Sequence, residues 1–188
     1  MMESSFAITE LDRRLSNLIQ IGTVVGADYP NAKLKVKIGD ITTDWLPWLT
    51  HRASNDTTWW APEVGEQVIV LAPSGELHQA VIMPSIYQSA HPAIDNSEDV
   101  SKTIYKDGTT TTYNRESHVL TVDVNSEGKV EVIIGASTIT MVDASIELKN
   151  GASTITITDG SIEHKNGGSS ILITGSSIKL SSAKIDLN

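Results

Sequence analysis

The last third of the chain repeats every sixteen residues, and this repeat constrains the fold more than any other feature of the sequence. Residues 135–150 read GASTITMVDASIELKN, residues 151–166 read GASTITITDGSIEHKN, and residues 167–182 read GGSSILITGSSIKLSS. Within each unit, apolar residues alternate with polar ones over two short runs, and turn residues such as Gly, Asp and Asn separate the runs. Such alternation predicts two short β-strands per unit, joined by tight turns.

The alternation assigns one face of these strands to a protein core. Each strand supplies only about two apolar side chains to that face, which would leave a single chain with a thin core and exposed strand edges. We therefore predict three intertwined chains that form a triple-stranded β-helix, a rigid needle whose apolar residues meet on a common axis. A single-chain β-solenoid is the alternative. The predicted trimer-core residues are Ile139, Met141, Ile146, Leu148, Ile155, Ile157, Ile162, Ile171, Ile173, Ile178 and Leu180.

One predicted core position carries a histidine instead of an apolar residue. His164 stands where the neighbouring repeats have Leu148 and Leu180. In a trimer three imidazoles would meet near the axis, and neutral imidazole is a good ligand for zinc, nickel or iron. Three ligands leave the coordination incomplete, so water or an anion would fill the rest. Because a buried or solvated histidine is the simpler interpretation, we expect weak or no specific binding of an axial metal ion at His164.

The first residues of the chain have the pattern of an amphipathic helix. In the region 1–20, the apolar residues Leu11, Leu15, Leu18 and Ile19 recur on one face of a helix. A terminal helix of this kind packs on its own domain or on a partner, and the sequence leaves both alternatives open.

The middle of the chain is predicted to form a small barrel. Residues 21–88 hold several short alternating runs, together with all four tryptophans of the chain, which favours a β-barrel of OB-fold size. Residues 89–100 are polar with one proline and are predicted to be a linker. The needle then spans residues 101–188, with the regular repeat beginning at residue 135. The fold class is thus mainly β with one short N-terminal helix.

Composition excludes several classes of function. The 188 residues contain no cysteine, which excludes disulfides and thiol catalysis. The net charge of -9 argues against nucleic-acid binding, which needs clustered positive charge. No apolar run approaches the ~18 residues of a membrane span, and the N-terminus lacks the layout of a signal peptide. Because the sequence also has no HExxH, GxSxG or P-loop motif, we expect no enzymatic activity and no required cofactor.

The barrel region closely resembles a known family. The segments DWL-WLTHRA, TWWAP-VGEQV and GEL within residues 43–87 are similar to the barrel domain of the baseplate assembly protein V family. This family comprises the central tail spikes of contractile-tailed phages and of R-type pyocins. The resemblance covers residues 10–88 directly and the needle in its architecture. It implies a homotrimer with an N-terminal helix, an OB-fold collar and a triple-stranded β-helix.

The chain departs from the family at its C-terminal end. Several spikes of the family end in a His-x-His apex that binds iron, and this sequence has no His-x-His. The predicted tip residues are Ile185, Leu187 and Asn188, which offer no pair of ligands. The tip iron of the family is therefore not carried over, and we expect closure of the tip by apolar packing, by a small capping protein, or by residues missing from a truncated chain.

The resemblance implies a mechanical function. Family members sit under the baseplate hub protein and are pushed through the bacterial outer membrane when the tail sheath contracts. We therefore expect a membrane-piercing spike at the tail tip, made in the bacterial cytoplasm. One alternative is a glycan-binding tail adhesin that uses Trp59 and Trp60. Another is a VgrG-like secretion-system spike, although such chains normally carry a larger hub domain before the barrel, and only about 20 residues precede it here.

Overall fold

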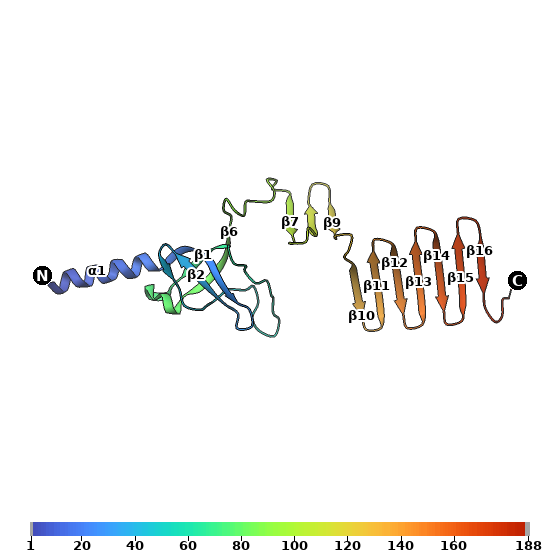
Figure 1. Cartoon of the computed structure of the whole chain (residues 1–188), viewed down its shortest axis with the longest axis horizontal. Helices are drawn as coiled ribbons and strands as arrows, with labels where there is room; N and C mark the ends of the chain where they lie inside the picture. Colours follow the sequence, from blue (N-terminus) through green and yellow to red (C-terminus); the bar gives the residue numbers. More distant parts are fainter. Residues whose placement is uncertain (1, 187–188) are drawn as a thin grey trace. The chain divides into compact units, whose positions relative to one another are not determined.

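The computed structural model describes residues 2–186 and separates into two compact units, Met1–Ala93 and Ile94–Asn188 (Figure 1). The first unit begins with helix α1, Met2–Asn17. The helix ends three residues before the end of the predicted region 1–20, because Ile19 and the residue after it already pair in the first strand. Sheet pairing therefore competes with helix propagation at this boundary and prevails.

One antiparallel sheet forms the barrel of the first unit. Its strands follow the order β3-β2-β1-β5-β6, and β4 pairs with β2. Two short 3-10 helices, η1 and η2, connect β5 to β6. The elements are β1 (Ile19–Asp28), β2 (Lys33–Ile38), β3 (Ile41–Thr42), β4 (Leu46–Pro47), β5 (Gln67–Leu71), η1 (Pro73–Gly75), η2 (Leu77–Gln79) and β6 (Val81–Ile86).

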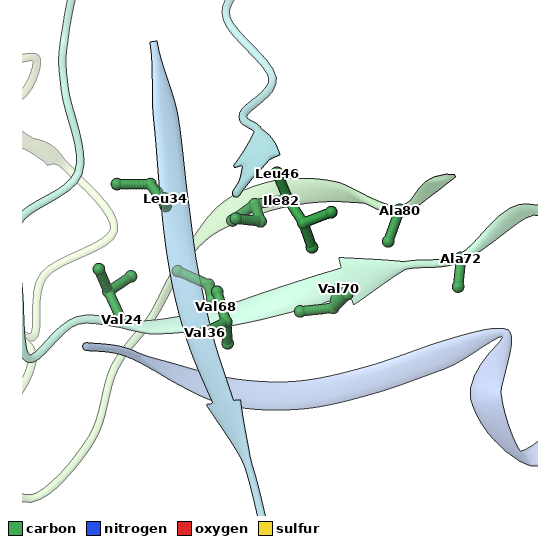
Figure 2. Close-up of a cluster of buried hydrophobic side chains, with 9 residues drawn as sticks. All are labelled: Val24, Leu34, Val36, Leu46, Val68, Val70, Ala72, Ala80 and Ile82. Atoms are coloured by element: carbon green, nitrogen blue, oxygen red, sulfur yellow. The ribbon is translucent and has the colours of Figure 1, made fainter. Parts of the chain in front are cut away.

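The barrel has an apolar core of its own. In β2 the alternation seen in the sequence places Leu34 and Val36 inside, and both are fully buried. Figure 2 shows how side chains from five strands converge there. The buried cluster consists of Val24, Leu34, Val36, Leu46, Val68, Val70, Ala72, Ala80 and Ile82.

The C-terminal end of helix α1 is fixed to the barrel. Asn17 Nδ2 donates a hydrogen bond to the carbonyl oxygen of Gly75 over 3.3 Å, and Arg13 pairs with Glu76 at 3.3 Å. The apolar side chains of the helix are not used for this attachment, since Leu11 and Leu15 remain about two-thirds exposed. The helix therefore presents an apolar stripe that no described residue of the barrel covers.

The second unit contains two separate sheets. A three-stranded sheet precedes a seven-stranded one, and each follows the order of the chain. The three-stranded sheet consists of β7 (Val100–Ile104), β8 (Thr110–Asn114) and β9 (Val119–Asp123). The seven-stranded sheet consists of β10 (Val130–Ile134), β11 (Ser137–Val142), β12 (Ser145–Asn150), β13 (Ser153–Thr158), β14 (Ser161–Asn166), β15 (Ser169–Thr174) and β16 (Ile178–Ser181).

Tight turns join the strands of the seven-stranded sheet into a meander. Along one margin the turns carry Gly135, Gly151 and Gly167, each with φ between +55° and +58°. This left-handed backbone explains why glycine recurs in phase with the repeat. Along the other margin, hydroxyl groups close the turns, as where Thr158 and Ser161 hydrogen-bond over 3.0 Å.

The meander corrects two expectations from the sequence. All consecutive strands from β10 to β16 pair antiparallel with their neighbours in the chain. The single-chain β-solenoid alternative is wrong for the described residues, because the coils of a solenoid would stack their strands in parallel. The inner strands also have both edges paired within one chain, so unpaired edges are not what calls for other chains. The triple-stranded β-helix stays a prediction.

Candidate functional site: an uncovered apolar sheet face

Two rows of apolar side chains cross the seven-stranded sheet on one face. Residues directly opposite each other in an antiparallel pair project from the same face. The register therefore links residues of all seven strands into continuous rows. The middle row is Val132, Ile139, Leu148, Ile155, His164, Ile171 and Leu180. The outer row is Val130, Met141, Ile146, Ile157, Ile162, Ile173 and Ile178.

All the predicted trimer-core residues lie in these two rows, so the structure brings them together on one surface. None of the described residues between 94 and 186 is buried. In the middle row Ile139 and Ile171 are each 42% exposed, whereas the core valines of the barrel are 1% exposed or less. An apolar face of this extent is typical of a surface that contacts another protein, a membrane or a ligand. The packing of these residues against other chains stays a prediction.

The opposite face of the same sheet is mainly polar, although Ile133 and Leu172 also project from it. One row there pairs Glu147 with Thr156 and Thr156 with Glu163, and a second pairs Lys149 with Thr154 and Thr154 with Lys165. These side chains are hydrated at no cost, so this face needs no cover. The sheet is thus amphipathic across its thickness, as period-two alternation requires.

A third row on the apolar face is polar, and the sequence analysis missed it. Ser137 pairs with Asn150, Asn150 with Ser153, Ser153 with Asn166, and Asn166 with Ser169. In one of these pairs Asn150 Nδ2 donates to Ser137 Oγ over 3.0 Å. The signal was present in the sequence, because the Asn or Ser stands two residues from an apolar position in each strand. This row lies at the margin that carries the glycine turns.

A groove runs along the middle row and the Ser/Asn row. It has a volume of about 690 Å³, and its lining includes Ile155, His164 and Asn166. Of the predicted tip residues, Ile185 follows the last strand and also lines this groove. Leu187 and Asn188 lie outside the described residues. The groove therefore belongs to the uncovered face and could bind an element of a neighbouring molecule.

His164 has no metal-ligating residue directly opposite it on the neighbouring strands. Its neighbours in the middle row are Ile155 on β13 and Ile171 on β15. Within residues 2–186 no group of three or more His, Cys, Asp or Glu side chains is placed to hold a metal ion. A metal site at His164 therefore needs ligands from other molecules.

The barrel carries an exposed aromatic surface. Trp59 contacts Trp48 edge-on, with ring centroids 5.4 Å apart, and is still 65% exposed. Trp60 is 69% exposed and lines a second groove of about 510 Å³ together with His51 and Glu66. Aromatic surfaces of this kind are common in protein interfaces and in sugar-binding sites.

The barrel has a second exposed apolar surface, which was not predicted from the sequence. Ile19 and Ile21 of β1 are 67% and 57% exposed, and they pair with Leu71 and Ile69 of β5. Both faces of β1 are therefore apolar, one in the core and one outside.

No described helix is both long enough and apolar enough to cross a membrane.

Two comparisons with known proteins identify the family of the chain. Residues 20–87 match the family described as the type VI secretion system/phage-baseplate injector OB domain. The chain is also 40% identical over 144 residues to the spike protein of Escherichia phage P2. The matched region covers 73% of this chain and 67% of that protein. The chain belongs to this family of phage spike and baseplate injector proteins. The family resemblance and the OB fold predicted for the barrel are both confirmed.

Proposed function

We propose that the chain is the central spike of a contractile-tail baseplate and acts as a homotrimer at the tail tip. The observation that carries the proposal is the uncovered apolar face of the β10–β16 sheet. Three such sheets, each turning its apolar face inward, would form a three-sided needle with one shared core. The family membership supports the role of the needle as a spike.

The energetics favour association through this face. Fully burying an exposed Ile or Leu side chain contributes ~1.5–3 kcal/mol, and row residues such as Ile139, which is 42% exposed, gain part of that amount when they are covered. Two apolar rows on each of three chains give a gain that exceeds the ~4–15 kcal/mol of freedom lost on association. Once assembled, the three chains would have to separate before any of them exposes this core, so unfolding is slow.

The mechanism is mechanical rather than chemical. The outer faces of the needle carry Thr, Ser, Glu and Lys, as in the rows through Thr154 and Thr156. Such a surface passes lipid and polysaccharide without a large apolar patch that adheres to them. We propose that sheath contraction drives this needle through the bacterial outer membrane. The barrel and helix α1 supply the surfaces for the baseplate hub, and the tip is closed by apolar packing or by a small capping protein.

Deletion of the repeat region tests the proposal. A chain that lacks residues 135–188 retains the buried core of the barrel, so we expect it to fold. Particles assembled with this chain should lose the ability to penetrate cells. Particles that remain fully active with the deletion would contradict the piercing function.

A second candidate function is glycan binding on the barrel. The groove beside Trp60 favours it, because an indole next to His51 and Glu66 combines an apolar platform with polar groups. The measurement is binding of the intact chain and of its Trp60→Ala variant to envelope polysaccharide. Binding that depends on Trp60 would support an adhesin, and its absence would leave the piercing spike alone.

A further inference from the structure

We propose that the three His164 side chains of the trimer form a binding site for one divalent transition-metal ion on the axis of the needle. This inference rests on the proposed trimer and assigns a ligand to the interior of that assembly. It concerns the middle of the repeat region and not the tip.

The position of His164 across the face of the sheet directs its side chain towards the axis of such a trimer. β14 has six residues, of which Ile162, His164 and Asn166 project from the apolar face. His164 is the central one of the three. In a needle with three equal sides, the centre of each inward face points at the axis, whereas the flanking positions point towards the corners. The three imidazoles therefore converge on one point.

The width of the sheet sets the distance between His164 and the axis. A strand of six residues at ~3.3 Å per residue is about 20 Å long. In a three-sided prism with sides of this length, the axis lies about 6 Å behind each side. An imidazole side chain spans most of that distance, and the remaining ~2 Å is the length of a zinc–nitrogen bond. The dimensions of the sheet thus suit three nitrogen ligands around a central ion.

The row around His164 offers its imidazole no hydrogen-bond partner. The cross-strand neighbours of His164 are Ile155 and Ile171, whose side chains can neither donate nor accept a hydrogen bond. Polar atoms left unpaired in a covered apolar core are costly. A metal ion on the axis satisfies one nitrogen of each ring, and a water molecule or an anion completes a tetrahedral site. The polar row through Asn166 offers partners for the other ring nitrogens.

The repeat itself supplies the matched controls. The positions equivalent to His164 in the two flanking units are Leu148 and Leu180, which also belong to the middle row. His164→Leu therefore restores the residue of the repeat at that position and should preserve assembly. Leu148→His should create a second axial site one unit away.

The test uses the full-length chain after removal of metal by a chelator. Its native mass is measured first, then Zn²⁺ or Co²⁺ is added, excess ion is removed by gel filtration, and bound metal is quantified by atomic spectroscopy. We expect one ion per three chains in the natural sequence, background in His164→Leu, and two ions per three chains in Leu148→His. Co²⁺ should give visible absorption bands of a four-coordinate site that are absent from His164→Leu.

The outcomes separate this inference from the proposed function. If the natural sequence and His164→Leu are both trimeric and retain the same amount of metal, the axial site is overturned and the spike stands. If neither is trimeric, the proposed needle itself is wrong. The other histidines, such as His51 and His118, are present in both proteins, so any metal on them cancels in the comparison.

Discussion

Gly75 of the barrel packs against the C-terminal end of helix α1. Its φ is +73°, and an added Cβ would lie 2.5 Å from Arg14 Cα, closer than non-bonded atoms approach. We therefore predict that Gly75→Ala lowers the free energy of unfolding by ~1–3 kcal/mol, since it combines backbone strain with a backbone clash. Thermal unfolding of the variant measures the loss.

Gly39→Ala is the matched control for this prediction. Gly39 also has positive φ, +55°, but open space surrounds its missing Cβ. The substitution there costs only the strain of a left-handed alanine, about 1 kcal/mol. Equal losses at the two glycines would show that contact with the helix is unimportant.

The charges on helix α1 give a pH dependence with a definite sign. Hydrogen bonds from Arg13 and Arg14 hold the pKa of Glu10 at about 2, below its ordinary value of 4.5. The stabilisation by ionised Glu10 is complete above pH 4.5 and is lost as the pH falls towards 2. We expect helix content, measured by circular dichroism, to fall over this range.

The Glu10→Gln variant isolates this contribution, because a neutral amide does not titrate. Its helix content should already be reduced at pH 6 and should change less between pH 4.5 and 2 than that of the natural sequence. Identical curves for the two proteins would show that Glu10 does not stabilise the helix.

At the scale of secondary-structure elements, the two faces of β13 should respond oppositely to the same charge. Ile157 lies in the outer apolar row, whereas Thr154 lies on the polar face between Lys149 and Lys165. Ile157→Asp would place a carboxylate in the shared core and should abolish the trimer, because a buried unpaired charge is prohibitive. Thr154→Asp gains attraction from both lysines and should leave the trimer intact.

Native mass at matched concentrations compares these two variants. A trimer with Asp at position 157 would show that the apolar face is not the surface that joins the chains.

The elements differ in how far the sequence predicts them. Period-two alternation is local, so the sequence was sufficient to place Ile139 and Ile155 on one face and Leu34 in the barrel core. Which strand edges pair is not local, because it depends on turn geometry and on distant neighbours. The antiparallel meander, the Ser/Asn row and the exposed apolar surface of the barrel at Ile21 are therefore evident only from the register in the structure.

The position of His164 shows the same division. The sequence identified a histidine at a core position but not where it stands across the sheet. The register puts it in the middle row, and this placement replaces the expectation of weak or no metal binding by the proposal of an axial site.

At the scale of the whole molecule, the two units differ in whether they bury their apolar side chains within one chain. Residues 1–93 bury a cluster of apolar side chains within one chain. In residues 94–186 no described side chain is buried, although the apolar rows are continuous across seven strands. We expect a domain of this size without a core of its own to be unstable as a monomer. Under the proposed function, the second unit therefore folds only when the chains assemble.

The native mass of the purified chain, measured by sedimentation equilibrium, tests this central claim most directly. The account predicts three times the chain mass of 20.3 kDa, about 61 kDa, with no dependence on concentration at micromolar levels. An unheated sample should also resist dissociation by SDS, because interlocked chains unfold slowly. A folded monomer of 20.3 kDa would contradict the shared core, and with it the needle and the axial site.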